Sequence, residues 1–136
     1  MQVYYFTRTN RSKDVAEEIA SHLSVKANMI KDEKKWDGVV NYIKGGALAA
    51  MKTTSVISCE AVNKEEKIVL VFPVWAGGFP PAVRTFVNEN SKANIILVPT
   101  SLGSKIKERE GFSEIIDLVG RSISASEVID KIKGLV

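Results

Sequence analysis

The chain has 136 residues, of which 45% are hydrophobic and 26% are charged, as expected for a globular protein with one hydrophobic core. No apolar run approaches the ~18 residues of a membrane-spanning helix, so we expect no contact with a membrane. The net charge is only +3, and charges of both signs alternate along the chain. Nucleic-acid binding needs a clustered basic patch, so we do not expect that partner either.

The chain has one cysteine, Cys59, so an internal disulfide cannot form, and we expect a cytoplasmic protein. It also has one histidine, His22, and so few ligands argue against a zinc-type metal site. The first residues enter a strand directly, without the basic and apolar regions of a signal peptide. The expected organisation is a single domain over residues 1–136.

The first predicted element is a buried strand over residues 2–6, and a helix is predicted over residues 12–24. The polar segment between them reads Thr7-Arg8-Thr9-Asn10-Arg11-Ser12. A loop in this place points backbone N–H groups and hydroxyls at the positive end of the helix dipole, which favours an anion such as phosphate. The alternative is an ordinary strand–helix turn, with Ser12 as the N-cap.

Residues 25–30 predict a weak second strand at an edge of the sheet. The charged residues 31–35 predict a solvated loop. A helical pattern follows over residues 36–51, in which Tyr42 lies either over a cofactor or against the core.

Residues 53–60 are rich in β-forming residues, with Val56 and Ile57 as the expected buried pair, but the pattern does not place this segment in the sheet. Residues 63–67 predict a polar turn, and the apolar residues 68–72 predict the third strand.

The segment after the third strand reads Pro73-Val74-Trp75-Ala76-Gly77-Gly78-Phe79-Pro80-Pro81. The two adjacent prolines begin a helix whose inner face is Val83, Phe86 and Val87. Trp75 either lies on a flat ligand, where as a loop residue it contributes little to the core, or is itself a core residue. The glycines either let backbone approach a ligand closely or form a tight turn.

The rest of the chain predicts a fourth strand over residues 94–98 and a loop over residues 99–104. Phe112, Ile115, Ile116 and Val119 have helical spacing, and Gly120 follows as a C-terminal stop. A short last strand over residues 121–125 and a helix capped by Ser126 complete the prediction.

Strands that alternate with helices predict an α/β fold with a doubly wound parallel sheet of about five strands in the order 2-1-3-4-5. Such sheets bind ligands where the strand order reverses, beyond the carboxyl ends of the first and third strands. The loops at 7–12, 73–78 and 99–104 follow the first, third and fourth strands, so we expect them to meet in one crevice.

The segments 7–12 and 73–78 resemble the two characteristic loops of the flavodoxin family. The first is similar to the family's phosphate loop, usually Ser/Thr-x-Thr-Gly-Asn-Thr, and the second to its flavin-flanking loop. The resemblance implies a three-layer flavodoxin-like fold with non-covalently bound FMN. This chain has Asn10 in place of the usual glycine and Arg11 in place of the asparagine. Its third loop lacks the aromatic residue that many family members place on the other flavin face; Leu102 is the nearest apolar residue, which implies an open face. Asn tolerates left-handed backbone better than most residues.

The resemblance also implies the roles of individual residues. The hydroxyls of Thr7, Thr9 and Ser12 would bind phosphate, and either Arg8 or Arg11 would assist or remain solvated. The implied cofactor-binding residues are Thr7, Arg8, Thr9, Asn10, Arg11, Ser12, Val74, Trp75, Ala76, Gly77, Gly78, Thr100, Ser101, Leu102 and Gly103. The flavin would carry out the chemistry, so we expect no catalytic side chain.

The implied function is electron transfer between larger redox proteins. One alternative is an NAD(P)H-dependent FMN oxidoreductase that reduces a quinone-type acceptor, and another is a flavin-free module that makes protein contacts. Electron carriers of the family are commonly acidic, whereas the pI of this chain is about 9.0. This difference raises the weight of the enzyme alternative. The expected partners are a redox protein, or NAD(P)H and a small acceptor.

Other nucleotide- and phosphate-binding classes lack their motifs here. The first strand is not followed by Gly-x-Gly-x-x-Gly, and no Walker A loop is present. A phosphorelay receiver would have acidic residues where Thr7 and Pro73 stand. A cysteine phosphatase would need a cysteine and an arginine in the phosphate loop, whereas the one cysteine, Cys59, lies elsewhere.

Overall fold

The computed structural model describes residues 1–33 and 54–135. The helix predicted over residues 36–51, with Tyr42, lies outside them. The elements in chain order are β1 (Gln2–Tyr5), α1 (Arg11–His22), β2 (Ala27–Met29), β3 (Lys31–Asp32), β4 (Ile57–Ser58), β5 (Ile68–Pro73), α3 (Pro81–Asn88), the 3-10 helix η1 (Lys92–Asn94), β6 (Ile95–Ser101), β7 (Glu114–Ile115), β8 (Leu118–Val119) and α4 (Ser126–Lys133).

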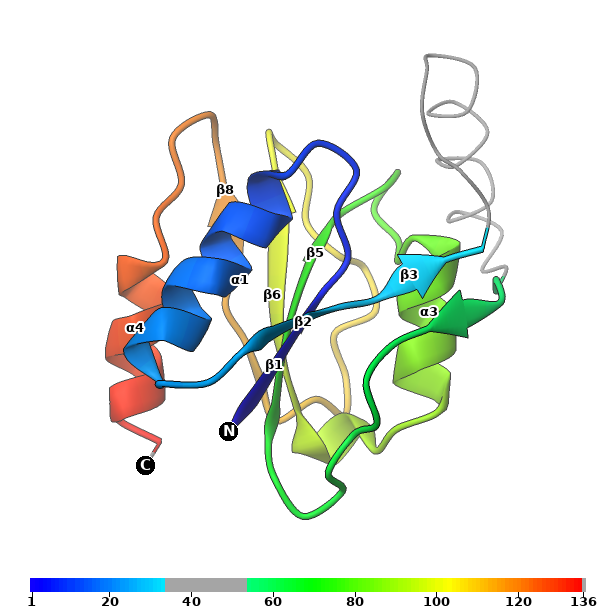
Figure 1. Cartoon of the computed structure of the whole chain (residues 1–136). Coiled ribbons are helices and arrows are strands. Elements are labelled where there is room, and N and C mark those ends of the chain that lie inside the picture. The colour runs from blue at the N-terminus through cyan, green and yellow to red at the C-terminus, as the bar shows by residue number, and fades with distance from the viewer. Residues whose placement is uncertain (34–53, 136) are drawn as a thin grey trace.

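The main sheet has the order β2-β1-β5-β6-β7, and all of its neighbouring strands are parallel. The short strand β8 also pairs with β6, further along the same edge, so β7 and β8 act as one interrupted fifth strand. Counted along the chain, this is the order 2-1-3-4-5, and the predicted flavodoxin-like α/β fold is confirmed. The weak strand β2 lies at the edge, as predicted (Figure 1).

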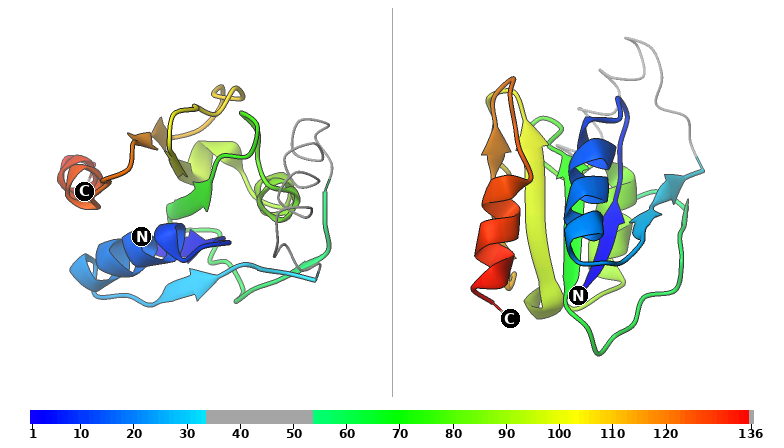
Figure 2. Two further views of the ribbon diagram at one scale, coloured as in Figure 1. Left: turned by 90° about the horizontal axis from the view of Figure 1, so that it is seen from above. Right: turned by 60° about the vertical axis from the view of Figure 1, so that its left-hand side comes forward.

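Helices cover both faces of the sheet, which gives three layers (Figure 2). Side chains alternate along each strand, so Val3 and Val69 belong to the core beneath α1 and α4, whereas Tyr4 and Leu70 belong to the core beneath α3. Strands β5 and β6 are buried on both faces, which explains why they read as continuous apolar runs. Each fully buried aliphatic side chain contributes about 1.5–3 kcal/mol to stability.

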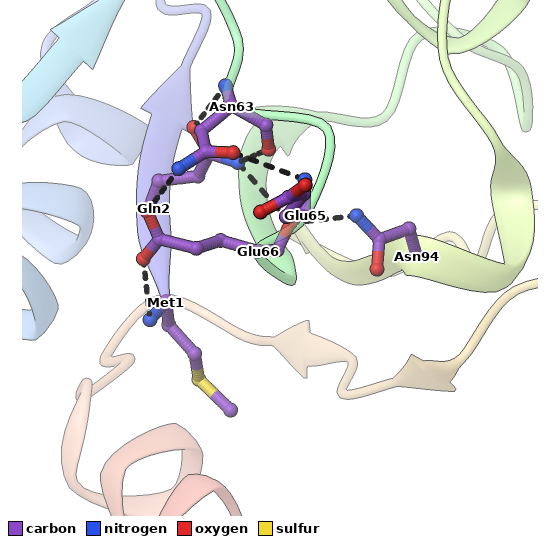
Figure 3. A network of polar contacts seen from close by, with 6 residues as sticks. All are labelled: Met1, Gln2, Asn63, Glu65, Glu66 and Asn94. Atoms are coloured by element: carbon purple, nitrogen blue, oxygen red, sulfur yellow. Dashed lines mark hydrogen bonds and ion pairs between the residues drawn. The ribbon is translucent and has the colours of Figure 1, made fainter.

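A polar network connects the strands of the sheet at the end where they begin (Figure 3). Gln2 exchanges two hydrogen bonds with the backbone of Asn63, and Glu66 accepts from the terminal ammonium at 3.3 Å and from the Asn63 amide at 2.9 Å. The amide of Asn94 donates to the Glu66 carbonyl at 2.6 Å. The predicted polar turn at 63–67 therefore connects the starts of β1, β5 and β6 through hydrogen bonds.

The helix predicted from Phe112 to Val119 is wrong, because this segment forms β7 and β8. Its apolar residues fit helical spacing but divide between the two faces of the sheet: Ile115 packs on the core beneath α3, and Ile116 on the other core. The edge of β6 decides the outcome. Its carbonyls accept three hydrogen bonds from this segment and the residue after it, namely those from the N–H groups of Ser113, Ile116 and Gly120.

Other local predictions are also corrected. Residues 121–125 form a loop, since 114–119 already supply the fifth strand, and β6 extends through Ser101 into the predicted loop. The N–H of Ser126, the residue expected to cap α4, instead donates to Ser124 Oγ at 3.1 Å.

The segment between the second and third strands of the main sheet also departs from the expectation. Residues 31 and 32 form β3, which pairs with β4, so they are not a simple solvated loop. Ile57 packs against the core, but Val56, which precedes β4, is 73% exposed, so the two do not form a buried pair. Within residues 1–33 and 54–135, no helix has the length and apolar character needed to cross a membrane.

Tyr4→Phe tests how the segment before β5 is held. The buried Tyr4 hydroxyl donates to the carbonyls of Glu60 and Ala61, at 3.0 and 2.9 Å. Burial raises the pKa of this hydroxyl, and Cys59 and Glu60 raise it further, so it remains a donor at neutral pH. We expect a loss of about 1–2 kcal/mol in the free energy of unfolding, measured in urea.

Tyr5→Phe is the matched control, because among the described residues the Tyr5 hydroxyl makes no hydrogen bond. It should change stability by less than about 0.5 kcal/mol. Equal losses in the two variants would contradict the role given to Tyr4.

Candidate functional site

A cavity of about 310 Å³ lies at the carboxyl ends of β1, β5 and β6, where three loops meet. The loops lie at the upper end of the sheet in Figure 1. The lining residues are Thr7, Arg8, Thr9, Arg11, Ser12, Pro73, Val74, Trp75, Thr100, Ser101, Leu102, Gly103 and Ser104. The structure thus brings together eleven of the fifteen residues predicted to bind a cofactor. Asn10, Ala76, Gly77 and Gly78 do not line the cavity, and Pro73 and Ser104 were not among the predicted residues.

Parallel pairing explains why the loops meet. The register aligns Tyr5 with Val71 and Val71 with Val98, so the three strands end at the same edge of the sheet. Because β1 and β5 are neighbours while their following helices α1 and α3 cover opposite faces, a crevice opens between the two loops.

Asn10 sets the shape of the first loop. Its φ of 66° lies in the left-handed region, where a family glycine would be expected, and its carbonyl accepts the first bond of α1 from the Asp14 N–H at 2.9 Å. The next three N–H groups, those of residues 11–13, have no carbonyl within the helix to bind, which makes them available to an anion. Asn10 therefore determines the backbone turn of the loop, and its neighbours Thr9 and Arg11 line the cavity.

Ser12 is the polar side chain most deeply placed in this loop, with 1% of its surface exposed. It lies inside α1, so it is not the N-cap. Its Oγ lies 2.9 Å from Thr100 Oγ1, and the Thr100 hydroxyl donates to the Phe72 carbonyl at 3.3 Å. With the Thr100 proton directed at Phe72, the Ser12 hydroxyl donates to Thr100, so donation to an anion in the cavity requires the Ser12 proton to turn away from Thr100.

The two arginines of the loop are placed differently. The Arg11 guanidinium donates to the carbonyl of Gly120, which joins the start of α1 to the loop after β8. Arg8 is exposed and lines the cavity. Arg8 therefore lies at the mouth, whereas Arg11 also fixes a neighbouring loop.

Trp75 belongs to the hydrophobic core and to the cavity wall. Only 4% of its surface is exposed, and its ring meets Phe6 edge-on with centroids 5.7 Å apart. The expectation that a loop tryptophan contributes little to the core is wrong, because β5 carries the loop back over the face covered by α3.

The glycines after Trp75 form a tight turn. The N–H groups of Trp75 and Gly78 each donate to the other's carbonyl, at 3.1 and 2.9 Å. Ala76 and Gly77 have φ of 50° and 73°, the pattern of a type I′ turn. The Lys107 N–H donates to the Gly77 carbonyl at 2.9 Å, and a Cβ on Gly77 would lie 2.9 Å from the Lys107 Cε. The turn therefore faces the third loop. Gly77 and Gly78 do not line the cavity, so the structure gives no support to the prediction that they approach a ligand.

The third loop has an exposed apolar tip. Leu102 is 73% exposed, and the Ser101 hydroxyl donates to the Ser104 carbonyl beneath it. The segment that follows is fixed from below by Ile106, which is buried, and by a bidentate pair between Arg84 of α3 and Glu108, with distances of 2.8 and 3.2 Å. This support was missed in the sequence because both partners read as surface charges.

No protein-family model and no curated protein matches the chain. Three solved structures are similar over nearly its full length. A candidate flavoprotein from Bacteroides uniformis has a TM-score of 0.74 at 20% identity, covering 97% of this chain and 96% of its own. A flavoprotein in complex with FMN from Lactobacillus acidophilus has a TM-score of 0.65 at 17% identity, covering 96% and 95%. A candidate flavoprotein from Bacteroides eggerthii has a TM-score of 0.74 at 15% identity, covering 98% and 95%. These likenesses show a shared fold.

Trp75→Ala should destabilise the protein. Removal of a nearly buried indole that packs on Phe6 should lower the free energy of unfolding by about 3–5 kcal/mol, measured in urea. Trp75→Phe retains part of the buried area and should lose less. A loss below about 1 kcal/mol in Trp75→Ala would mean that the indole is not part of the core.

Proposed function

We propose that this chain binds FMN non-covalently in the cavity and serves as an electron-transfer flavoprotein. The observation that carries the proposal is the composition of the cavity, which joins a hydroxyl-rich anion cradle at the start of α1 to an apolar wall formed by Trp75 and Leu102. FMN has the same two parts, a phosphate and a planar ring. The similarity to the Lactobacillus acidophilus flavoprotein, which was crystallised with FMN, supports the choice of flavin.

The residues at the first loop fit a phosphate group. Thr7, Thr9 and Ser12 offer hydroxyls, and the start of α1 offers N–H groups and the positive end of the helix dipole. Arg8 adds a positive charge at the mouth. The Ser12–Thr100 hydrogen bond holds the deepest hydroxyl in place, so little side-chain freedom is lost when an anion binds.

The residues at the other end of the cavity fit a flat ring. Trp75 is held by Phe6 and by the turn at residues 75–78, so its indole is a rigid wall. Leu102 also lines the cavity and has 73% of its surface exposed, so the cavity is open to solvent beside it. Bound FMN supplies the redox chemistry, and these residues orient it and control access to it.

A second candidate function is that of an NAD(P)H-dependent FMN oxidoreductase with a quinone-type acceptor. The exposure of Leu102 favours it, because an open ring face could admit a nicotinamide. Electron exchange with a partner protein uses the same opening, so the cavity alone accommodates both roles.

FMN should bind far more tightly than riboflavin, which lacks the phosphate. Each hydrogen bond from a hydroxyl to the phosphate dianion should contribute about 1.5–3 kcal/mol, so Ser12→Ala should weaken FMN binding by this amount and leave riboflavin nearly unchanged. Titration followed by flavin fluorescence gives both affinities. Ser91→Ala removes an exposed hydroxyl remote from the cavity and is the matched control. Equal affinities for the two flavins would exclude the phosphate assignment.

Direct reduction by NADPH or NADH separates the two candidate functions. The FMN-loaded protein is mixed with each nucleotide without oxygen, and the flavin absorbance is followed. The proposed carrier should show no bleaching over about an hour but rapid bleaching when a reductase protein is added, because electrons then arrive through protein docking. Bleaching by the nucleotide alone within seconds would favour the oxidoreductase.

A further inference from the structure

We propose that the mouth of the cavity docks an electron-transfer protein with an acidic face. This inference rests on the proposed function and adds the class of partner. Its basis is a set of positive side chains around the cavity mouth, which we term the cationic rim: Arg8, Arg11, Lys105, Lys107 and Arg121.

Contacts place Arg8, Arg11 and Lys107 near the mouth, and adjacency in the chain places Lys105 and Arg121 there. Arg8 and Arg11 line the cavity. Arg121 follows Gly120, whose carbonyl binds Arg11. The other two members come from the third loop: Lys105 follows Ser104, a lining residue, and the backbone of Lys107 is hydrogen-bonded to the turn after Trp75.

Three of the rim charges are available to a partner. Among the residues that the structure describes, Lys105, Lys107 and Arg121 are exposed and form no ion pair. The nearby carboxylates of Glu108 and Asp117 are already bound, by Arg84 and Arg109 respectively.

Other carboxylates near the rim in the chain or the fold do not balance it. Asp14 and Glu127 lie in the first turns of α1 and α4, and Glu127 lines a second cavity together with Lys105. Glu110 is exposed three residues after Lys107. Even without Arg8, the four other rim cations outnumber these three carboxylates among the described residues, whereas the turn at 63–67, at the other end of the sheet, has two lysines and two glutamates.

Leu102 gives the mouth an apolar centre. It is 73% exposed, lines the cavity and lies three residues before Lys105. An apolar centre within a polar rim is the usual anatomy of a protein interface. Electrons must pass through the open side of the cavity, so a partner has to approach there, and opposite charge accelerates such encounters while like charge suppresses them. The partner that fits is therefore acidic around an apolar contact.

The test measures binding of a fluorescently labelled acidic plant-type ferredoxin to the FMN-loaded protein by anisotropy. Cytochrome c, which is basic and of similar size, is the opposite-charge probe. We expect the ferredoxin to bind and the cytochrome not to bind, and ferredoxin affinity to fall at least about tenfold between about 50 and about 300 mM salt.

Charge reversals locate the interaction on the molecule. Lys107→Glu with Arg121→Glu changes the rim in two loops, and Lys64→Glu with Lys133→Glu makes the same change in net charge at the other end of the sheet. The rim pair should weaken ferredoxin binding by about tenfold or more, and the distant pair by less than about twofold. Equal losses would mean that only net charge matters, and this would overturn the proposal.

Two further outcomes would also overturn it. Tighter binding of cytochrome c than of ferredoxin would reverse the sign of the partner. Equally tight, rim-dependent binding of a short DNA duplex would indicate a general polyanion site rather than a protein-docking surface.

FMN binding is measured separately from ferredoxin binding. Failure of the protein to bind FMN refutes the proposed function, and the ferredoxin measurement on the flavin-free protein still tests the rim. Normal FMN binding without rim-dependent ferredoxin binding refutes the docking surface alone.

Discussion

Parallel pairing of β1 with β5 and of β5 with β6 is the constraint on which the candidate site depends. It aligns the three strand ends, so that the loops at 7–12, 73–78 and 99–104, which are distant along the chain, meet at one edge. Side chains then join the loops to one another. The Ser12–Thr100 hydrogen bond connects the first and third loops, and the Lys107 N–H connects the third to the second. The cavity is thus a property of strand register and cannot be assigned to any one loop.

Trp75 shows how closely the site and the core are combined. The same indole closes the core beneath α3 and forms a wall of the cavity. Its position depends on a turn with two residues of positive φ, one of which is Ala76, where left-handed backbone costs roughly 1 kcal/mol. A rigid wall loses little freedom when a ring binds against it, so the strain and burial at this loop are consistent with the proposed flavin site. The open side at Leu102 has the opposite character, since it is solvated and accessible to a partner.

Positive charges are distributed unevenly over the described part of the molecule, and the small net charge does not reveal this. A value of +3 over the whole chain is small, yet the first loop, the segment after the third loop and the loop after β8 all have cations near the cavity mouth, while the turn at 63–67 at the other end of the sheet has both signs. Because exposed charges act over only about 8–10 Å at physiological salt, it is this local arrangement that a partner meets. The basic pI distinguishes the chain from acidic carriers, and the cationic rim is one place where the positive charges responsible for it gather.

The sequence by itself determined the fold class, the strand order and most of the cavity lining, because buried parallel strands read as apolar runs and the loops after them had distinctive residues. It also indicated that Asn10 could take a left-handed conformation, which depends only on local backbone sterics. Tertiary structure decided what periodicity could not. Residues 112–119 have helical spacing but became β7 and β8, because β6 has an edge that needs hydrogen bonds. The burial of Trp75, the turn at Gly77, the engagement of Arg11 by Gly120 and the grouping of the rim all depend on contacts between segments distant in the chain, and such contacts leave no local signal.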